Sequence, residues 1–320
     1  MIIKEDVYKK AFEAKKNALR EKQTLRETAA AAAYNAEPRL TEIDRSLSSI
    51  GASLAIAALS GADVTNLKKQ SEALSREKKV LLDKFGVQDI KYDCPLCSDT
   101  GYVNGRICGC VKHLVAAFIA EEMSEEMPLG LSRFDNFDLK YYPDKDTKDG
   151  NPRRRMTKIF KTCYEYAFEF DPKTSGNLLF MGDAGLGKTH LTLAMVGKII
   201  EKGFVPVYGS AENLFSQIEK EKFTDGNRGA YDAMIKSDRL VIDDLGAEMA
   251  TPFSKSALYN LVNTRLLANR PTVINTNLTM KEIEARYTPR ISSRLIGSFA
   301  SHKFIGADIR QQKAVEKMGK

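Results

Sequence analysis

A glycine-rich loop in the second half of the chain constrains the fold more than any other feature of the sequence. Counted from Gly182, the segment Gly-Asp-Ala-Gly-Leu-Gly-Lys-Thr fits the pattern G-x-x-x-x-G-K-S/T. It follows a predicted strand at 178–181 and opens a predicted helix at 187–202, which is the context that a phosphate-binding loop requires. The backbone N–H groups of such a loop and the helix N-terminus surround the phosphates of a nucleotide. A chance glycine-rich turn is the competing interpretation.

The side chains of this loop indicate the cofactors. Lys188 is placed to reach the β- and γ-phosphates, and the Thr189 hydroxyl is placed to bind magnesium, so we expect ATP and Mg²⁺. His190 follows on the same helix without a visible partner, and a histidine in that setting is more often structural. The candidate nucleotide contacts are Gly182, Asp183, Ala184, Gly185, Leu186, Gly187, Lys188, Thr189 and His190.

A second element supplies carboxylates. The apolar run 240–243 ends in Asp243 and Asp244, as expected of a strand that brings acidic groups to a phosphate-binding loop. We expect Asp243 to hold magnesium and Asp244 to orient the attacking water, with Glu248 as a competing candidate for the second role. The pair favours hydrolysis over phosphoryl transfer to a small molecule.

From Gly176 onward short apolar runs alternate with helical patterns, which predicts an α/β fold with a parallel sheet and helices on both faces. Between these strands we expect helices at 211–221 and 254–269 and two short helices after 275. Asn151-Pro152 predicts the start of a further helix that runs to about residue 170. The predicted strands are 178–181, 205–208, 240–243, 272–275 and 303–305.

The first part of the chain is different in texture. Residues 4–85 are rich in Ala, Glu, Lys and Leu, and apolar residues recur at helical spacing on either side of the break at Gly61. Two such helices fold most simply into an antiparallel hairpin. This segment is either a spacer or dimerising coil, or an arm that docks on a partner. An acidic helix is predicted at 114–127.

Four of the five cysteines lie close together in the sequence. Cys94 and Cys97 form one pair and Cys108 and Cys110 a second, and four thiolates suit a closed tetrahedral zinc site that can fold a module without a core of its own. An iron–sulfur cluster and reduced, unliganded cysteines are the alternatives, and His113 could replace Cys108 or Cys110. The fifth cysteine, Cys163, is expected to be a core residue.

The charge is also unevenly distributed. The formal net charge is +7, and residues 251–320 alone carry 12 basic against 4 acidic side chains. This surplus permits an anionic partner without naming one. The chain has no run of 18 apolar residues and no signal-peptide core at its start, so we expect a cytoplasmic protein with no membrane partner.

Together the loop, the carboxylates and the strands resemble the AAA+ ATPases, specifically the DnaC/DnaI-like replicative helicase loaders and the similar IstB-like transposition helpers. The resemblance runs from about residue 177 onward and more loosely through 134–138. It implies that 243–248 is the Walker B segment and that Asn277 contacts the γ-phosphate or the attacking water. The implied domains are a helical arm at 1–89, a zinc module at 90–115, lead-in helices at 116–172 and the AAA+ domain at 173–320.

The same resemblance assigns three arginines. Arg294, with Arg290 close behind it, matches the arginine finger that acts on the nucleotide of a neighbouring subunit, which implies self-association. Arg310 matches the sensor arginine that acts within its own subunit. Only about 15 residues follow the last predicted strand, so the usual helical lid is expected to be missing or reduced.

The function implied is that of a helicase loader. Its N-terminal region would bind a replicative hexameric DNA helicase, and its ATPase domain would bind nucleotide and single-stranded DNA. A helper of a DNA transposase is the alternative, and a small-molecule kinase is a third hypothesis that leaves Asn277 and Arg294 without roles. Aromatic and basic residues after the second strand are candidate DNA contacts, although packing within the core explains the aromatic ones slightly better: Phe215, Lys220, Lys222, Phe223, Arg228 and Tyr231.

Overall fold

The computed structural model describes residues 4–61, 63–126, 132–223 and 229–318. The chain divides into two compact units, residues 12–108 and the remainder, which comprises 1–11 and 109–320. Helix α1 (Lys4–Ala36) begins in the second of these units and continues into the first. None of the described helices combines the length and the apolar composition that a membrane crossing requires.

The unit formed by residues 12–108 is built mainly from helices. After α1, helices α2 (Arg39–Ser60) and α3 (Thr65–Lys84) pack against each other as the predicted hairpin, and Gly61 ends α2 in the left-handed conformation with φ of 69°. Ion pairs join Arg39 to Glu77 and Lys78 to Asp44. A short two-stranded hairpin, β1 (Tyr102–Val103) with β2 (Arg106–Ile107), follows.

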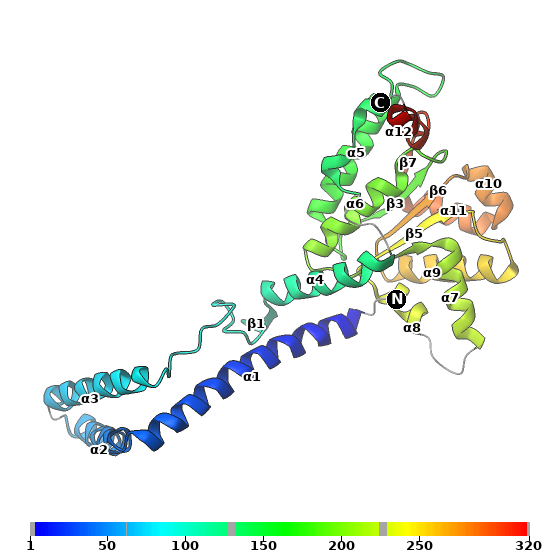
Figure 1. The fold of residues 1–320 in the computed structure, drawn as a ribbon. Helices are drawn as coiled ribbons and strands as arrows, with labels where there is room; N and C mark the ends of the chain where they lie inside the picture. Colours follow the sequence, from blue (N-terminus) through cyan, green and yellow to red (C-terminus); the bar gives the residue numbers. More distant parts are fainter. Residues whose placement is uncertain (1–3, 62, 127–131, 224–228, 319–320) are drawn as a thin grey trace. The chain divides into compact units, whose positions relative to one another are not determined.

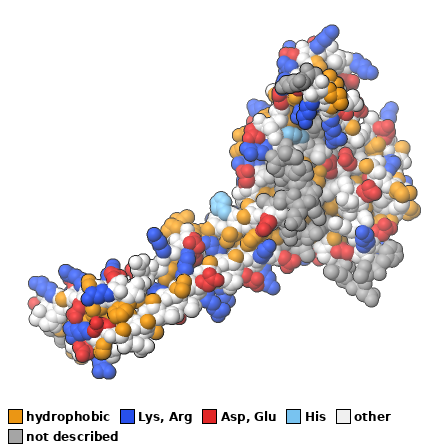
Figure 2. Space-filling model, viewed as in Figure 1, with side chains coloured by type: hydrophobic (Ala, Val, Ile, Leu, Met, Phe, Trp, Pro, Cys, Tyr) orange, Lys and Arg blue, Asp and Glu red, His pale blue; other side chains and the backbone are white. Residues whose placement is uncertain are grey.

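The apolar stripe on these helices is only partly covered. Leu40 and Ile43 are fully buried at the start of α2, whereas the later members of the stripe are half-buried. Ile56 and Leu59 near the end of α2 are 68% and 91% exposed. Hydrophobic atoms therefore lie among charged ones on the surface of this unit (Figure 2).

The second unit contains a five-stranded parallel sheet (Figure 1). The strand that precedes the glycine-rich loop, β3, is the fourth in the order β4-β5-β6-β3-β7, so its carboxyl end lies beside that of β6. The predicted α/β class is confirmed. The strands are β3 (Asn177–Met181), β4 (Pro206–Ser210), β5 (Arg239–Leu245), β6 (Thr272–Thr276) and β7 (Phe299–Lys303).

Helices cover both faces of this sheet, because its central strands are continuously buried and so present residues to a core on each face. Helix α6 (Lys188–Glu201) lies against one face, with α5 (Pro152–Glu169) and α4 (Gly109–Glu126) packed on it. A hydrophobic core lies on the other face, where Leu179, Ile242 and Ile274 meet several helices. These helices are α7 (Ala211–Phe223), α8 (Gly229–Lys236), α9 (Pro252–Leu267), α10 (Met280–Arg286) and α11 (Pro289–Ser298).

The prediction for the last strand was wrong in position. Residues 299–303, not 303–305, pair with β3, with Phe299 opposite Asn177 and Lys303 opposite Met181. The segment is polar and partly exposed because β7 is an edge strand, and this hides it from a search for apolar runs. Phe304 and Ile305 are instead buried packing residues beyond the strand.

Other predicted elements were close to their observed bounds. Helix α5 starts as expected, with the Asn151 side chain accepting a hydrogen bond from the Arg154 N–H and with proline in its first turn. Phe215 is buried and Tyr231 packs on the core, which favours packing over DNA contact for these two rings. Met127, Arg228 and the side chain of Phe223 lie outside the described residues.

Candidate nucleotide-binding site

The glycine-rich loop turns between β3 and α6 as the sequence predicts. Gly182, Gly185 and Gly187 all have positive φ, at 142°, 74° and 85°. A Cβ atom at Gly187 would lie 2.9 Å from the Phe137 ring and from the Tyr142 hydroxyl, so space as well as backbone conformation requires glycine there. The loop leaves the N-terminus of α6 open to an anionic ligand.

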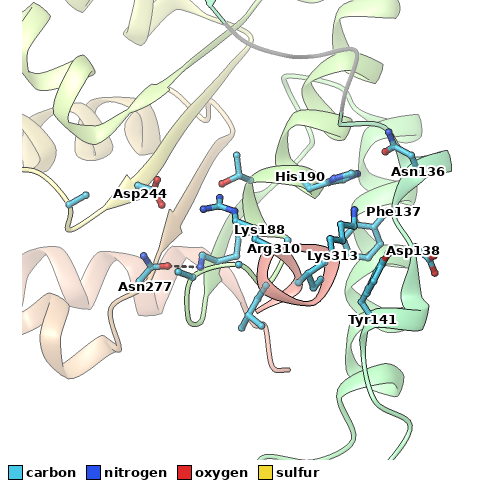
Figure 3. A pocket seen from close by; sticks show the side chains of 17 residues that line it. Asn136, Phe137, Asp138, Tyr141, Lys188, His190, Asp244, Asn277, Arg310 and Lys313 are labelled. Carbon is cyan, nitrogen blue, oxygen red and sulfur yellow. Dashed lines mark hydrogen bonds between the residues drawn. The ribbon is translucent and has the colours of Figure 1, made fainter. Parts of the chain in front are cut away.

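A cavity of about 330 Å³ lies over this loop (Figure 3). Four parts of the chain line it: the loop itself, the segment 136–141 before α5, the carboxyl ends of β5 and β6, and the last helix, α12 (Ile309–Met318). The lining residues from outside the loop are Asn136, Phe137, Asp138, Tyr141, Asp244, Ala247, Asn277, Ile309, Arg310 and Lys313. A nucleotide in this cavity would therefore meet side chains from all four parts of the chain.

Lys188 is held in place at the cavity floor. Its ammonium donates to the Asn277 Oδ1 atom and the Gly182 carbonyl oxygen, each at 2.6 Å, and to the Asp183 carbonyl oxygen at 2.8 Å. The contact with Asn277 is the dashed line in Figure 3. Burial lowers the pKa of Lys188, and the charges of Asp244 and Asp243 oppose that shift. The structure thus brings together two predicted site residues that lie far apart in the sequence.

Asp243 and Thr189 form the oxygen pair that a magnesium ion would use. The Thr189 hydroxyl lies 3.4 Å from the Asp243 Oδ1 atom, and the Asp243 side chain is almost completely buried. A hydroxyl and a carboxylate are ligands that Mg²⁺ prefers, and magnesium keeps most of its coordination sphere for water and phosphate. The pair therefore fits this ion, either directly or through water.

Asp244, not Glu248, presents its carboxylate to the cavity. Asp244 has a φ of 50°, and the pairing of β5 with β6 shifts register between Ile242 and Leu245, so a bulge turns this side chain toward the loop. Burial, and then the charge of Asp243, raises the pKa of Asp244. Glu248 is buried and accepts hydrogen bonds from the Gly246 N–H and the Tyr287 hydroxyl.

The segment before α5 supplies an aromatic wall that the sequence analysis did not assign to the site. Tyr142 is fully buried and its hydroxyl donates to the Leu186 carbonyl oxygen, which ties the segment to the loop. Phe137 stacks on Tyr142 and meets His190 edge-on at 5.4 Å. Burial lowers the pKa of His190, which favours the neutral form of this ring. A purine base would find flat, uncharged partners here.

The three arginines are placed differently. Arg310 lines the cavity from α12, where Lys313 joins it one turn later. Arg294 is not among the lining residues; its Nε atom donates to Asn263 Oδ1 at 2.9 Å, and its guanidinium lies 4.5 Å from the centre of the Tyr259 ring. Arg290 is exposed on the same helix. Helix α12 is anchored to the glycine-rich loop by the Ile309 N–H, which donates to the Gly185 carbonyl oxygen.

The four clustered cysteines converge. Their sulfur atoms all lie within 4.8 Å of one another, and those of Cys94 and Cys108 are 3.8 Å apart. A zinc ion with four sulfurs at about 2.3 Å requires sulfur–sulfur distances of about 3.8 Å, so the set fits zinc. Hydrogen bonds, first from the Cys97 N–H, lower the pKa of Cys94 to about 7 and favour the thiolate. His113 is exposed and is not part of the cluster.

Asp99 supports this cluster from behind. Its buried carboxylate accepts from the Cys94 N–H at 2.8 Å, the Asp93 N–H at 2.8 Å and the Lys15 ammonium of α1 at 2.8 Å. Burial disfavours the charged form, but these donors outweigh it and lower the pKa of Asp99 to about 2. Cys163, in contrast, is buried in the core as predicted, and burial raises the pKa of its thiol to about 12.

Comparison with known proteins agrees with this geometry. The model of IstB-like ATP binding proteins matches residues 157–303. The phage-like element PBSX protein XkdC of Bacillus subtilis (strain 168) is 25% identical over 228 residues, which are 66% of this chain and 82% of XkdC. The replicative helicase loader DnaC of Escherichia coli (strain K12) is 26% identical over 136 residues, which are 41% of this chain and 54% of DnaC.

A crystal structure of the DnaC helicase loader aligns with a TM-score of 0.46 and 20% identity, covering 54% of this chain and 98% of that one. In the sequence comparison, the match spans little more than half the length of the curated DnaC relative. The family match falls on the segment that carries the glycine-rich loop, both carboxylates and Asn277. Residues 157–303 therefore form an IstB/DnaC-like ATP-binding domain.

Proposed function

We propose that the protein is an ATP-dependent loader of a replicative DNA helicase. The observation that carries the proposal is the combination, in one chain, of a nucleotide cavity at Lys188 and Asp244 with a separate helical unit that exposes apolar residues. The ATP-binding domain would act as the engine and the helical unit as the part that recognises the client. The similarity to proteins named helicase loaders supports this choice of client.

In this proposal the chain hydrolyses ATP. The loop N–H groups and Lys188 bind the phosphates, and Thr189 and Asp243 hold magnesium, which neutralises charge on the phosphates when bound. Asp244 orients the attacking water, and Asn277 contacts the γ-phosphate. Arg310 stabilises the developing charge within the subunit, and Arg294, which lies outside its own cavity, reaches the nucleotide of a neighbouring copy.

The helical unit binds the helicase. Ile56 and Leu59 give the hairpin a partly apolar surface, and burial of such a surface is the usual source of affinity between proteins. The cysteine cluster would hold zinc as a structural ion, because four protein ligands leave no open position for catalysis. ATP binding would favour the complex of loader, helicase and single-stranded DNA, and hydrolysis would release the loader.

The test uses the full chain and the replicative hexameric helicase of the same organism. Replacing Ile56 and Leu59 together by Glu should abolish binding of the helicase in a pull-down, while ATP binding is retained. Leu267→Glu serves as the matched control, because Leu267 is 80% exposed on α9 in the ATP-binding unit. Undiminished helicase binding by the double variant would count against the docking role of the hairpin.

A helper ATPase for a DNA transposase is the alternative, and the IstB-like family match favours it. The same cavity would then drive assembly on a different client. Purification of the tagged protein from its native cell separates the two, because the loader should recover a hexameric helicase and the helper a transposase.

A further inference from the structure

The carboxylate of Asp243 is surrounded by donors from four elements: α6, β4, β5 and β6. Its Oδ1 atom accepts from the Asn275 amide at 2.7 Å and from the Asp244 N–H at 3.0 Å, and it lies 3.4 Å from the Thr189 hydroxyl. Its Oδ2 atom accepts a hydrogen bond from the Tyr208 hydroxyl. A carboxylate has about four lone-pair sites, so protein donors engage nearly all of them.

The two strands beside β5 supply the outer donors. Ser210 of β4 is the register partner of Asp243, and Tyr208 lies two residues earlier on the same face, so its long side chain reaches along the sheet to the carboxylate. Asn275 approaches from β6 on the other side and is completely buried. Its Oδ1 atom in turn accepts from the Thr192 hydroxyl of α6 at 3.1 Å.

The contacts of Asp243 differ in length, and the differences indicate which contact a bound metal ion would replace. The contact of Asp243 with Thr189 is the longest of the four, and Thr189 is itself a candidate magnesium ligand. This contact can give way to an ion between the two side chains, whereas the shorter contacts with Tyr208 and Asn275 hold the carboxylate from the neighbouring strands β4 and β6. Partners of this kind orient a ligating carboxylate and fix its basicity.

We propose that Tyr208 is a positioning residue for magnesium: with Asn275 opposite, its hydroxyl holds Asp243 in the orientation that the magnesium–nucleotide complex requires. The inference rests on the proposed function, since it assumes that magnesium and nucleotide bind at this site. Tyr208 does not touch the nucleotide cavity itself, because it is not among the residues that line it. Its effect is therefore confined to the metal and should not extend to the nucleotide alone.

The test compares Tyr208→Phe with the parent, using the full chain and a fluorescent ADP derivative. In EDTA the affinity for this nucleotide should equal that of the parent. The Mg²⁺ concentration that half-saturates the magnesium-dependent gain in affinity should rise about tenfold, the lower end of the range for outer partners of metal ligands. Tyr166→Phe is the matched control, because it also removes one phenol hydrogen bond, the 2.6 Å contact with the Gly176 carbonyl oxygen.

Two results would overturn the inference. One is an unchanged Mg²⁺ requirement in Tyr208→Phe, and the other is an equal shift in Tyr166→Phe, which would indicate general loosening of the domain. Failure of the proposed function looks different, because the parent itself would then show no magnesium-dependent nucleotide binding. Thermal unfolding of both variants reports whether the fold is retained.

Discussion

Replacing Asp244 by Asn should separate nucleotide binding from hydrolysis. Asp244 is the carboxylate that the bulge in β5 turns into the cavity, whereas Asp243 is held by Tyr208 and Asn275. The substitution keeps the shape of the side chain and removes its charge and its capacity to accept a proton. A positioned acid–base group contributes about 10²–10⁴ to the rate, so kcat should fall by that factor, or roughly 3–5 kcal/mol in the barrier.

The affinity for ATP should not fall with kcat in the Asp244→Asn variant. Asp244 carries a negative charge beside the place where the phosphates lie, and its raised pKa shows that the folded protein disfavours this charge. In the asparagine variant ATP should therefore bind at least as tightly as in the parent. The sign for stability follows: the folded-state pKa lies above the unfolded one, so stability is lost as the pH rises through it. At pH 7 the variant should melt at the same temperature as the parent or higher.

The assay is phosphate release under saturating ATP, with binding of a fluorescent ATP analogue measured in parallel. Glu248→Gln is the control, because Glu248 is occupied by Gly246 and Tyr287 outside the cavity. Loss of the Glu248 carboxylate should lower the melting temperature, whereas kcat should change little. The reasoning would be refuted if Asp244→Asn kept the parent rate while Glu248→Gln lost hydrolysis at an unchanged melting temperature.

Arg294→Ala should retain ATP binding and lose roughly 10³-fold in assembly-dependent hydrolysis; mixing it with Lys188→Ala subunits should restore turnover, and no recovery on co-assembly would contradict a role in the neighbouring site. Metal analysis should find about one zinc per chain, lost in Cys94→Ser; Asp99→Asn should release zinc to a chelator more readily, because Asp99 anchors the Cys94 N–H, and equal retention would contradict this. Arg239 is fully buried against Tyr166 and Phe170, with no hydrogen-bond partner for its guanidinium among the described residues; Arg239→Met should leave the melting temperature unchanged or raise it, and a large drop would show that the charge is compensated.

The sequence predicted those parts of the molecule whose signals are local. The glycine-rich loop needs a fixed spacing, and the apolar strands β3, β5 and β6 are buried on both faces, so both are visible as continuous runs. The cysteine pairs are equally local. The position of β7 was not predicted, because this strand lies at the edge of the sheet and its residues are mostly polar and partly exposed.

The features that escaped prediction depend on tertiary contacts. Tyr208 reads as an ordinary strand residue until β4 places it beside Asp243, and the choice between Asp244 and Glu248 depends on a bulge that no spacing reveals. Phe137 and Tyr141 lie far from the glycine-rich loop in the sequence, and only the fold brings them to the same cavity. Lys313 had one available signal, its position one helical turn after Arg310.

In the proposed function, ATP bound at this site controls delivery of a helicase to single-stranded DNA. Its most direct test mixes the protein with the replicative helicase of the same organism and a closed circular single strand that carries an annealed oligonucleotide. The parent protein with ATP should greatly increase displacement of the oligonucleotide, and Lys188→Ala should not. Equal displacement with the parent, with Lys188→Ala and with no added protein would contradict the claim.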